Sequence, residues 1–384
     1  MGSPSAHVAE RRTAYARSGV DVAAGERAVD LMRASVEATH GGRVMGGLGG
    51  FAGVIPVPAG MREPLLVSST DGVGTKTAIA AALNRFDTIG ADLVAMCADD
   101  VVCNGAAPLF FLDYIAVGRL IPEAIAELVA SIARGCDDAG CALVGGETAE
   151  HPGLMGPDAF DLAGCCVGVV ERERLIDGSA VVAGDVIVGL AASGLHANGF
   201  SLVRSLLGQY DLDLSRPYQE VLRRSLGDET GDALVGAEPE HVFATLGEVL
   251  LTPTRVYARA ILEARERLAR RGADLHAIAH ITGGGLPGNV VRVLPEGLGA
   301  RLDPATWTMP SVMRLFGALG GLEDDELRAV FNGGIGMVVV VAASDADQVG
   351  EEFRTAGIQS WAIGEVLPLD QLGGSRYLEA PSPR

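Results

Sequence analysis

Acidic side chains beside glycine-rich loops are the residues of this sequence best suited to chemistry. Asp71 lies in SSTDGVGTK, Asp99 and Asp100 follow the apolar stretch ADLVAMC, and Glu147 lies in GGETAE. Mg²⁺ binds one or two protein carboxylates and completes its octahedron with phosphate oxygens and water. A single Asp in a turn more often caps a helix. Several such acids, each beside a glycine loop that follows an expected strand, favour a magnesium site.

Glycine is abundant, with 52 residues, and it clusters in loops that follow short apolar runs. Such loops let the backbone approach a ligand closely, and their N–H groups can cradle a phosphate. The pattern therefore predicts a phosphorylated ligand. The loops cover residues 41–53, 68–76, 145–153, 193–199 and 282–289.

The familiar nucleotide motifs do not account for these loops. GVGTKT (72–77) lacks the glycine before the lysine and the spacing of a P-loop, and GLGGFA (47–52) follows no strand. GGGLPG (283–288) follows a strand, and Asp303 lies 20 residues after Gly283, as in a dinucleotide fold. The helix after it can run only to Leu294 before Pro295, too short for the crossover of that fold. A phosphate cradle is the simpler interpretation.

Three further polar residues have two interpretations each. His196 and Asn198, in SGLHANG, could donate hydrogen bonds to a phosphate or a substrate amide, or could be structural. Lys76 fits either a phosphate contact or a place on the surface. The residues alone thus predict an enzyme that binds Mg²⁺ and a phosphorylated ligand, without identifying the substrate.

Composition excludes several classes of protein. With 49 acidic and 30 basic residues the net charge is −19, which opposes binding to nucleic acid. The longest apolar stretches are far shorter than the roughly 20 residues of a membrane helix, and the N-terminus has no apolar segment typical of a signal peptide. We therefore expect a cytoplasmic protein without a membrane partner. The six cysteines form no CxxC pair and are expected to be reduced and buried.

The pattern of apolar residues predicts an α/β (α+β) fold of two mixed domains. A charged stretch places the boundary between residues 1–171 and 172–384, and residues 1–14 read as a disordered leader. Residues 211–240 read as an exposed, partly helical excursion with few core contacts. Helices are expected over 77–83, 92–103, 122–134, 198–207 and 254–270, and strands over 65–67, 109–117, 142–144, 161–170, 186–190, 277–281 and 336–341.

A series of motifs carries a family resemblance. VMGGLGGFAG, STDGVGTK, FDTIGADLVAMC, PLFFLDYIAVG, LVGGETAEHPG, SGLHANGFSLVR, LTPTRVY, HAIAHITGGGLPGN and FNGGIGM occur in this order over nearly the whole chain. They resemble the phosphoribosylformylglycinamidine cyclo-ligases. The resemblance implies ATP-dependent ring closure of formylglycinamidine ribonucleotide to aminoimidazole ribonucleotide in purine biosynthesis, with release of ADP and phosphate. It also implies a homodimer in which the N-terminal domains pair through their sheets.

The resemblance assigns roles to individual residues. Asp71 and Asp100 would bind Mg²⁺, and these two acids, Lys76 and His196 would form the catalytic group. The ATP site would comprise Gly46, Gly47, Gly49, Gly50, Asp71, Gly72, Gly74, Thr75 and Lys76. The substrate site would comprise Gly145, Gly146, Glu147, Thr148, Ser193, His196, Asn198, Gly283, Gly284 and Gly285.

Two departures and several relatives qualify the resemblance. Asp99 stands where the family often has Asn, and the stretch 207–250 is about twenty residues longer than usual. Thiamine-monophosphate kinase and selenophosphate synthetase share the acid-and-glycine ATP site, but the latter uses an N-terminal Cys or selenocysteine, and the first cysteine here is Cys97. The hydrogenase-maturation relative needs a C-terminal Cys, and none follows Cys166. A non-catalytic nucleotide-binding module would leave all the acids without a role.

Overall fold

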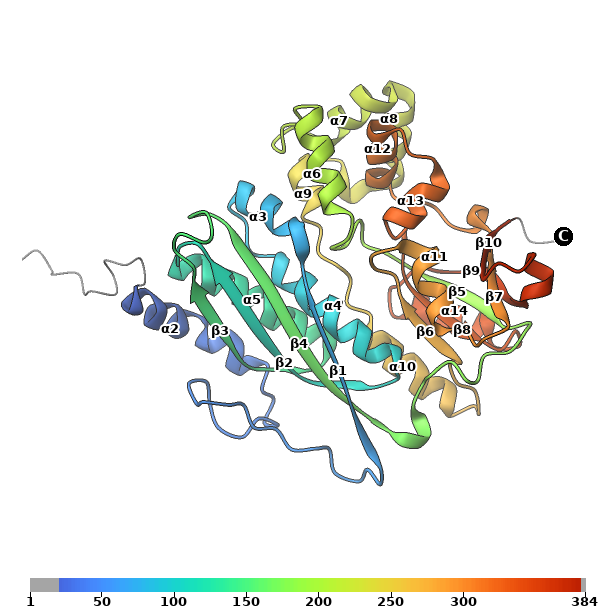
Figure 1. Cartoon of the computed structure of the whole chain (residues 1–384), viewed down its shortest axis with the longest axis horizontal. Helices are drawn as coiled ribbons and strands as arrows, with labels where there is room; N and C mark the ends of the chain where they lie inside the picture. Colours follow the sequence, from blue (N-terminus) through green and yellow to red (C-terminus); the bar gives the residue numbers. More distant parts are fainter. Residues whose placement is uncertain (1–20, 381–384) are drawn as a thin grey trace, which may run out of the picture.

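The computed structural model describes residues 21–380, so the predicted leader at 1–14 lies outside the described residues. Two sheets with helices packed around them form the molecule (Figure 1). The four-stranded first sheet has the order β1-β4-β2-β3, in which only β2 and β3 are parallel. The six-stranded second sheet has the order β10-β7-β9-β5-β8-β6, in which only β10 and β7 are parallel. The predicted mixed α/β fold is confirmed.

Strands and helices alternate along much of the chain. The strands are β1 (Pro64–Gly72), β2 (Ala107–Val117), β3 (Ala142–Glu150), β4 (Phe160–Glu171), β5 (Val186–Ala191), β6 (Ala277–His280), β7 (Leu298–Leu302), β8 (Ile335–Val341), β9 (Ser360–Pro368) and β10 (Tyr377–Glu379). The α-helices are α2 (Val22–Ala38), α3 (Thr77–Leu83), α4 (Ile89–Cys103), α5 (Pro122–Ala139), α6 (Phe200–Gln209), α7 (Tyr218–Leu226), α8 (Asp228–Ala237), α9 (Leu246–Leu250), α10 (Ala258–Ala269), α11 (Gly285–Val290), α12 (Ser311–Gly320), α13 (Asp324–Val330) and α14 (Ala346–Thr355). None of the helices between residues 21 and 380 is both long and apolar enough to span a bilayer.

Helix α4 connects the first half of the molecule, built on the four-stranded sheet, with the second half, built on the six-stranded sheet. It packs on β1, β2 and β4 of the first sheet and also contacts β6 and α10 of the second half. Glycine in β4 permits this close approach, because a β-carbon at Gly168 would lie 2.5 Å from the side chain of Val101. No helix of residues 21–380 covers the opposite face of the first sheet (Figure 1), and Leu66, Leu112 and Tyr114 are exposed there.

Local signals explain where helix α5 begins and ends. Pro122 occupies its first position, where a missing N–H costs nothing, and Gly140 ends it in the left-handed region at φ 80°. Its buried side, which includes Ile125, Leu128 and Ile132, has the spacing of one helix face. The helix runs five residues beyond the expected end at Arg134.

One expectation about a loop was wrong, and the expectation for residues 211–240 is confirmed except for their core contacts. GGETAE is not a loop, because β3 continues through Glu150 and pairs in parallel with β2. Residues 211–240 are partly helical and mostly exposed, as expected: they form α7 and α8, although Val221, Leu222 and Val235 are buried. Tyr218 is also buried, and its hydroxyl lies 2.8 Å from Oγ of Ser311. The apolar side of these two short helices gives the segment more core contacts than its acidic composition indicates.

Candidate active site

Three of the predicted loops meet at one cavity between the two halves, here called the aspartate cavity. Its volume is about 560 Å³. Asp71 reaches it from the end of β1, Asn198 from the loop before α6, and Gly283 from the loop after β6. The cavity is lined by Asp71, Gly72, Val73, Gly74, Met96, Asp161, Leu162, Ala163, Ala197, Asn198, Thr282 and Gly283. Loops far apart in the sequence are thus brought together as expected for a ligand site.

Asp100 lines a second cavity, here called the histidine cavity, of about 360 Å³. Ser69 donates a hydrogen bond to Oδ2 of Asp100 at 3.0 Å, and Nδ1 of His280 lies 3.0 Å from Oδ1. Arg292 lines the same cavity. The sequence interpretation missed His280, although its place at the end of an apolar strand and just before TGGG was a usable signal.

The two aspartates differ in their pKa shifts. Burial raises the pKa of Asp71, and the negative charge of Asp100 raises it further, against an opposing hydrogen bond from the N–H of Gly72. Burial would also raise the pKa of Asp100, but hydrogen bonds from His280 and Ser69 outweigh it and the net pKa is lowered. A divalent cation beside both carboxylates would relieve their repulsion.

The donor set fits Mg²⁺ better than a metal bound by protein ligands alone. Within residues 21–380 no group of three or more His, Cys, Asp or Glu side chains is placed to hold a metal ion. Two carboxylates that face cavities, with room for phosphate oxygens and water, match the coordination habits of Mg²⁺. Asp71 and Asp100 are the residues that would hold it.

Asp99 faces away from this site. Its Oδ1 accepts hydrogen bonds from the N–H groups of Tyr257 at 2.9 Å and Ala258 at 2.8 Å, at the start of α10. Burial raises the pKa of Asp99 to about 7. The extra acid therefore caps a helix of the second half and supplies no ligand to the cavities.

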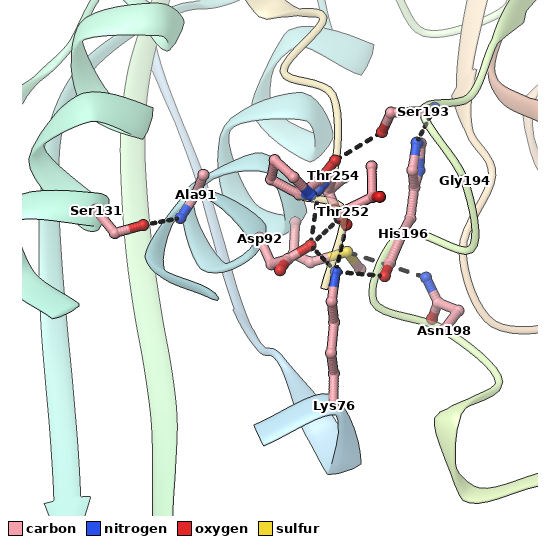
Figure 2. Close-up of polar contacts among 12 residues, drawn as sticks. Lys76, Ala91, Asp92, Ser131, Ser193, Gly194, His196, Asn198, Thr252 and Thr254 are labelled. Atoms are coloured by element: carbon pink, nitrogen blue, oxygen red, sulfur yellow. Dashed lines mark hydrogen bonds and ion pairs between the residues drawn. The ribbon is translucent and has the colours of Figure 1, made fainter. Parts of the chain in front are cut away.

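Lys76 is buried, so the expectation that it lies on the surface was wrong, and it lines neither of these two cavities. Its ammonium is fully buried and donates to Oδ1 of Asp92 at 2.9 Å, to the carbonyl of His196 at 3.0 Å and to the carbonyl of Thr252 at 2.7 Å (Figure 2). All three ammonium hydrogens are thereby used. Burial lowers the pKa of Lys76 and raises that of Asp92, while their mutual attraction opposes both shifts. We call this cluster of Lys76, Asp92, Thr254 and the two carbonyls the lysine node.

His196 is likewise structural in this arrangement. The residue has φ 60°, which is rare outside glycine, and its ring is buried. The N–H of Ser193 donates to its Nε2 at 3.1 Å, so the ring is neutral with the proton on Nδ1, and burial lowers its pKa well below the usual value. Ser193 donates its hydroxyl to the carbonyl of Pro253 at 2.7 Å and lies at a separate surface groove. Neither residue reaches the aspartate cavity.

Gly284, Gly285 and Thr75 were also predicted as site residues, but none of them lines the aspartate cavity. Gly284 and Gly285 form the start of α11, and a β-carbon at Gly285 would lie 1.9 Å from the carbonyl oxygen of Arg328, so close packing explains that glycine. Thr75 is half-buried, with its hydroxyl 3.3 Å from that of Ser201.

The glycine loop expected over the metal-bound nucleotide instead lines a third cavity, the glycine-loop cavity, of about 590 Å³. It brings residues 47–53 together with Gly145, Gly146, Glu147 and Thr148, which were assigned to the substrate. Gly46, at φ 94°, lies beside the bridge between Met45 and Val54 and does not line this cavity. In the described part of the chain, no residue lines both this cavity and either of the other two.

The family models and curated relatives agree with each other. Residues 50–170 match the N-terminal domain of AIR synthase related protein, and residues 182–374 match its C-terminal domain. Phosphoribosylformylglycinamidine cyclo-ligase of Synechococcus sp. (strain CC9605) is 47% identical over 92% of this chain and 95% of its own length. The enzyme of the same name from Thermosynechococcus vestitus is 48% identical over 92% of this chain and 96% of its own length.

Solved structures share the fold at lower identity. Thiamine-monophosphate kinase from Stenotrophomonas maltophilia has a TM-score of 0.60 and 18% identity, covering 92% of this chain and 95% of the other. Hydrogenase maturation protein HypE in complex with ATP has the same TM-score and identity, covering 93% and 91%. These two likenesses concern the fold, whereas the cyclo-ligases match in sequence along almost their entire length. The chain therefore belongs to the phosphoribosylformylglycinamidine cyclo-ligase family of AIR synthase related proteins.

Proposed function

We propose that this protein closes the imidazole ring of aminoimidazole ribonucleotide, using formylglycinamidine ribonucleotide and ATP and releasing ADP and phosphate. The observation that carries the proposal is the meeting of the Asp71, Asn198 and Gly283 loops at one cavity beside Asp100. A cytoplasmic location stays a prediction.

The reaction requires the protein to position the two substrates and to neutralise the charge of the phosphate groups, more than to supply a nucleophile. ATP transfers its terminal phosphoryl group to the formyl oxygen of the substrate. An amidine-side nitrogen then attacks the formyl carbon and loses a proton, while the C–O bond breaks and phosphate leaves with the bonding electrons. Asp71 and Asp100 would hold Mg²⁺, which supplies positive charge against the phosphate oxygens. Backbone N–H groups of residues 72–74 and 282–283 would orient the ligand.

The glycine-loop cavity is proposed as a ribonucleotide site that completes this arrangement. Asp71 and Asp113 both pair with Gly164, from opposite sides, so their Cα atoms lie two strand spacings, roughly 10 Å, apart. The two cavities are therefore close enough to serve one reaction.

A homodimer paired through the first sheet is part of the proposal. The helix-free face of this sheet exposes apolar side chains of two strands, Leu66 at 66%, Leu112 at 37% and Tyr114 at 41%. Exposed apolar faces of this kind are typical of interaction surfaces. Sedimentation should give a dimer at assay concentration, and an active monomer would contradict the proposal.

The decisive experiment asks which phosphorylated compound makes the protein consume ATP. Formylglycinamidine ribonucleotide should trigger release of ADP and formation of aminoimidazole ribonucleotide, and thiamine monophosphate should not. ATP turnover with thiamine monophosphate alone would assign the chain to the kinases instead.

A further inference from the structure

An acidic side chain without a partner lies in the glycine-loop cavity. Asp113, on β2, lines this cavity opposite residues 47–53 of the glycine loop. Among residues 21–380, none donates a hydrogen bond to Asp113 or forms an ion pair with it. By contrast, each of the other half-buried or buried aspartates of the first half described above accepts at least one hydrogen bond. A carboxylate without a donor in a structured cavity is a candidate ligand contact.

The neighbouring strand is built to make room for this carboxylate. Asp113 pairs with Gly146 of β3, and a β-carbon at position 146 would lie 1.7 Å from Oδ1 of Asp113. Any other residue at position 146 would displace the carboxylate. Gly146 therefore leaves the carboxylate free to face the cavity.

The rest of the lining indicates which part of a ligand belongs beside Asp113. The α2 side is apolar, with Ala28, Val29 and Met32. Among residues 21–380, the charged residues that line the cavity are Asp113 and Glu147, and no Lys or Arg side chain of this range lines it. This environment opposes a phosphate and favours an uncharged group that donates hydrogen bonds. An ionised carboxylate is a pure acceptor with two oxygens, which match two adjacent hydroxyl donors.

We propose that Asp113 accepts hydrogen bonds from the 2′ and 3′ hydroxyls of a ribose, and so selects ribonucleotides at the glycine-loop cavity. The inference rests on the proposed function, in which the cavity holds a ribonucleotide. Both ATP and formylglycinamidine ribonucleotide carry this diol, and the phosphate end of either would lie outside the acidic part of the cavity.

Burial of the carboxylate supports the same assignment. Burial raises the pKa of Asp113 to about 7, with no hydrogen bond to oppose the shift. Bound hydroxyls stabilise the ionised form, so binding near or below pH 7 should release a proton. The buried thiol of Cys136 on α5 lies close enough to Asp113 to interact with its charge, whereas Glu147 follows Gly146 on β3 and points to the opposite face of the sheet. Arg33 and Glu37 of α2 lie farther out, beside the glycine loop.

Calorimetry on the full chain tests the inference with each ligand alone. ATP and formylglycinamidine ribonucleotide are titrated into the wild type, Asp113→Asn and, as matched control, Asp158→Asn, whose side chain is 83% exposed. Asp113→Asn should weaken the binding of one of the two ligands by about tenfold to a hundredfold, as for hydrogen bonds to a charged group. The weakened ligand identifies the source of the ribose. Asp158→Asn should bind both ligands like the wild type.

Deoxy ligands and proton release keep the test independent of folding of the variant. The 2′-deoxy form of the identified ligand should bind the wild type more weakly, and Asp113→Asn should weaken it less than it weakens the ribo form, because only the 3′ hydroxyl contact is left to lose. In buffers of different ionisation enthalpy, the wild type should release a proton that Asp113→Asn does not. Gly146→Ala, which displaces the carboxylate, should reproduce the loss in affinity.

The possible failures can be told apart. If the wild type binds its ligands and closes the ring, but Asp113→Asn keeps both affinities, the inference is wrong and the proposed function stands. Equal losses for the ribo and deoxy ligands would also overturn it. A wild type that binds neither ligand would instead refute the proposed function.

Discussion

The lysine node and the pair of cavities at Asp71 and Asp100 are built from the same parts. Each uses a carboxylate of α4, a segment at or just after β1, and a loop of the second half. In the node, the side chains of Lys76 and Asp92 are both 0% exposed and every ammonium hydrogen is bonded inside the protein. Asp100, by contrast, keeps 42% of its side chain exposed and faces a cavity. The degree of burial, rather than the motif that contains a residue, distinguishes the charged side chains that stabilise the fold from those that can bind a ligand.

The largest expected effect comes from breaking the node. Lys76→Met leaves Asp92 as an uncompensated buried charge, so the free energy of unfolding should fall by roughly 3–5 kcal/mol. Urea unfolding at neutral pH measures this change, and a second substitution, Asp92→Leu, should recover part of the loss.

A surface ion pair provides the control for the node. Arg62→Met removes an ion pair with Glu173 whose side chains are 75% and 65% exposed, and should change stability by less than about 1 kcal/mol. A stable Lys76→Met variant that had lost ATP affinity would contradict the structural role of the node and return Lys76 to the ligand site.

Substitutions in the cavities should show the opposite pattern. Asp71→Asn and Asp100→Asn keep side-chain volume and lie at cavity walls, so melting temperatures should change little. Turnover should fall by about 10²–10³, because charge on the phosphate oxygens is no longer neutralised. Turnover and melting temperature are measured over a range of Mg²⁺ concentrations. Near-normal turnover with a lowered melting temperature would make both residues structural caps.

His280 should have a smaller effect, since it acts through Asp100. Its Nδ1 holds Oδ1 of the carboxylate, and loss of such supporting contacts costs about 10–100-fold in metal affinity or activity. His280→Ala should therefore raise the Mg²⁺ concentration needed for half-maximal turnover by that factor. His276→Ala is the matched control, because His276 forms a similar contact with Asp185 at 2.7 Å but lines none of the three cavities. Equal effects of the two substitutions would remove His280 from the site.

The smallest expected effect tests the packing of α7 and α8. Tyr218→Phe removes the hydroxyl that bonds Ser311 and should lower the free energy of unfolding by about 1 kcal/mol, with unchanged turnover. Thermal unfolding and a turnover assay measure both quantities. A large loss of turnover in a folded variant would connect this segment to catalysis.

The sequence predicted the regular elements well where the local signal was strong. The helix at Thr77–Leu83 has the expected bounds, and the expected strands at 109–117 and 161–170 lie within β2 and β4. The strand through GGETAE was missed because its polar and glycine-rich composition is typical of a loop. Its pairing with β2 depends on tertiary contacts that the sequence does not display.

The sequence predicted which loops form the candidate site, but it did not predict which side chains of those loops point into the cavities. The meeting of the Asp71, Asn198 and Gly283 loops was expected, and the structure brings them together. Lys76 and His196 lie in the same motifs, yet their side chains are buried in the protein. Motif spacing cannot say whether a polar side chain faces a cavity or a neighbouring element, because adjacent residues of one loop point in different directions. Asp113 was missed for the complementary reason: a single acid in an apolar strand carries no motif of its own.

Helix α4 sets a limit on how the two halves can move. Asp92 bonds Thr254, Asp99 bonds the first N–H groups of α10, and Asp100 contacts His280, so three acids of one helix reach across to the second half. A hinge rotation that separated the two halves would remove the hydrogen bonds from the second half to the buried carboxylates of Asp92 and Asp99, which is costly in free energy. We therefore expect the helix and the sheets on either side of it to move together when a ligand binds.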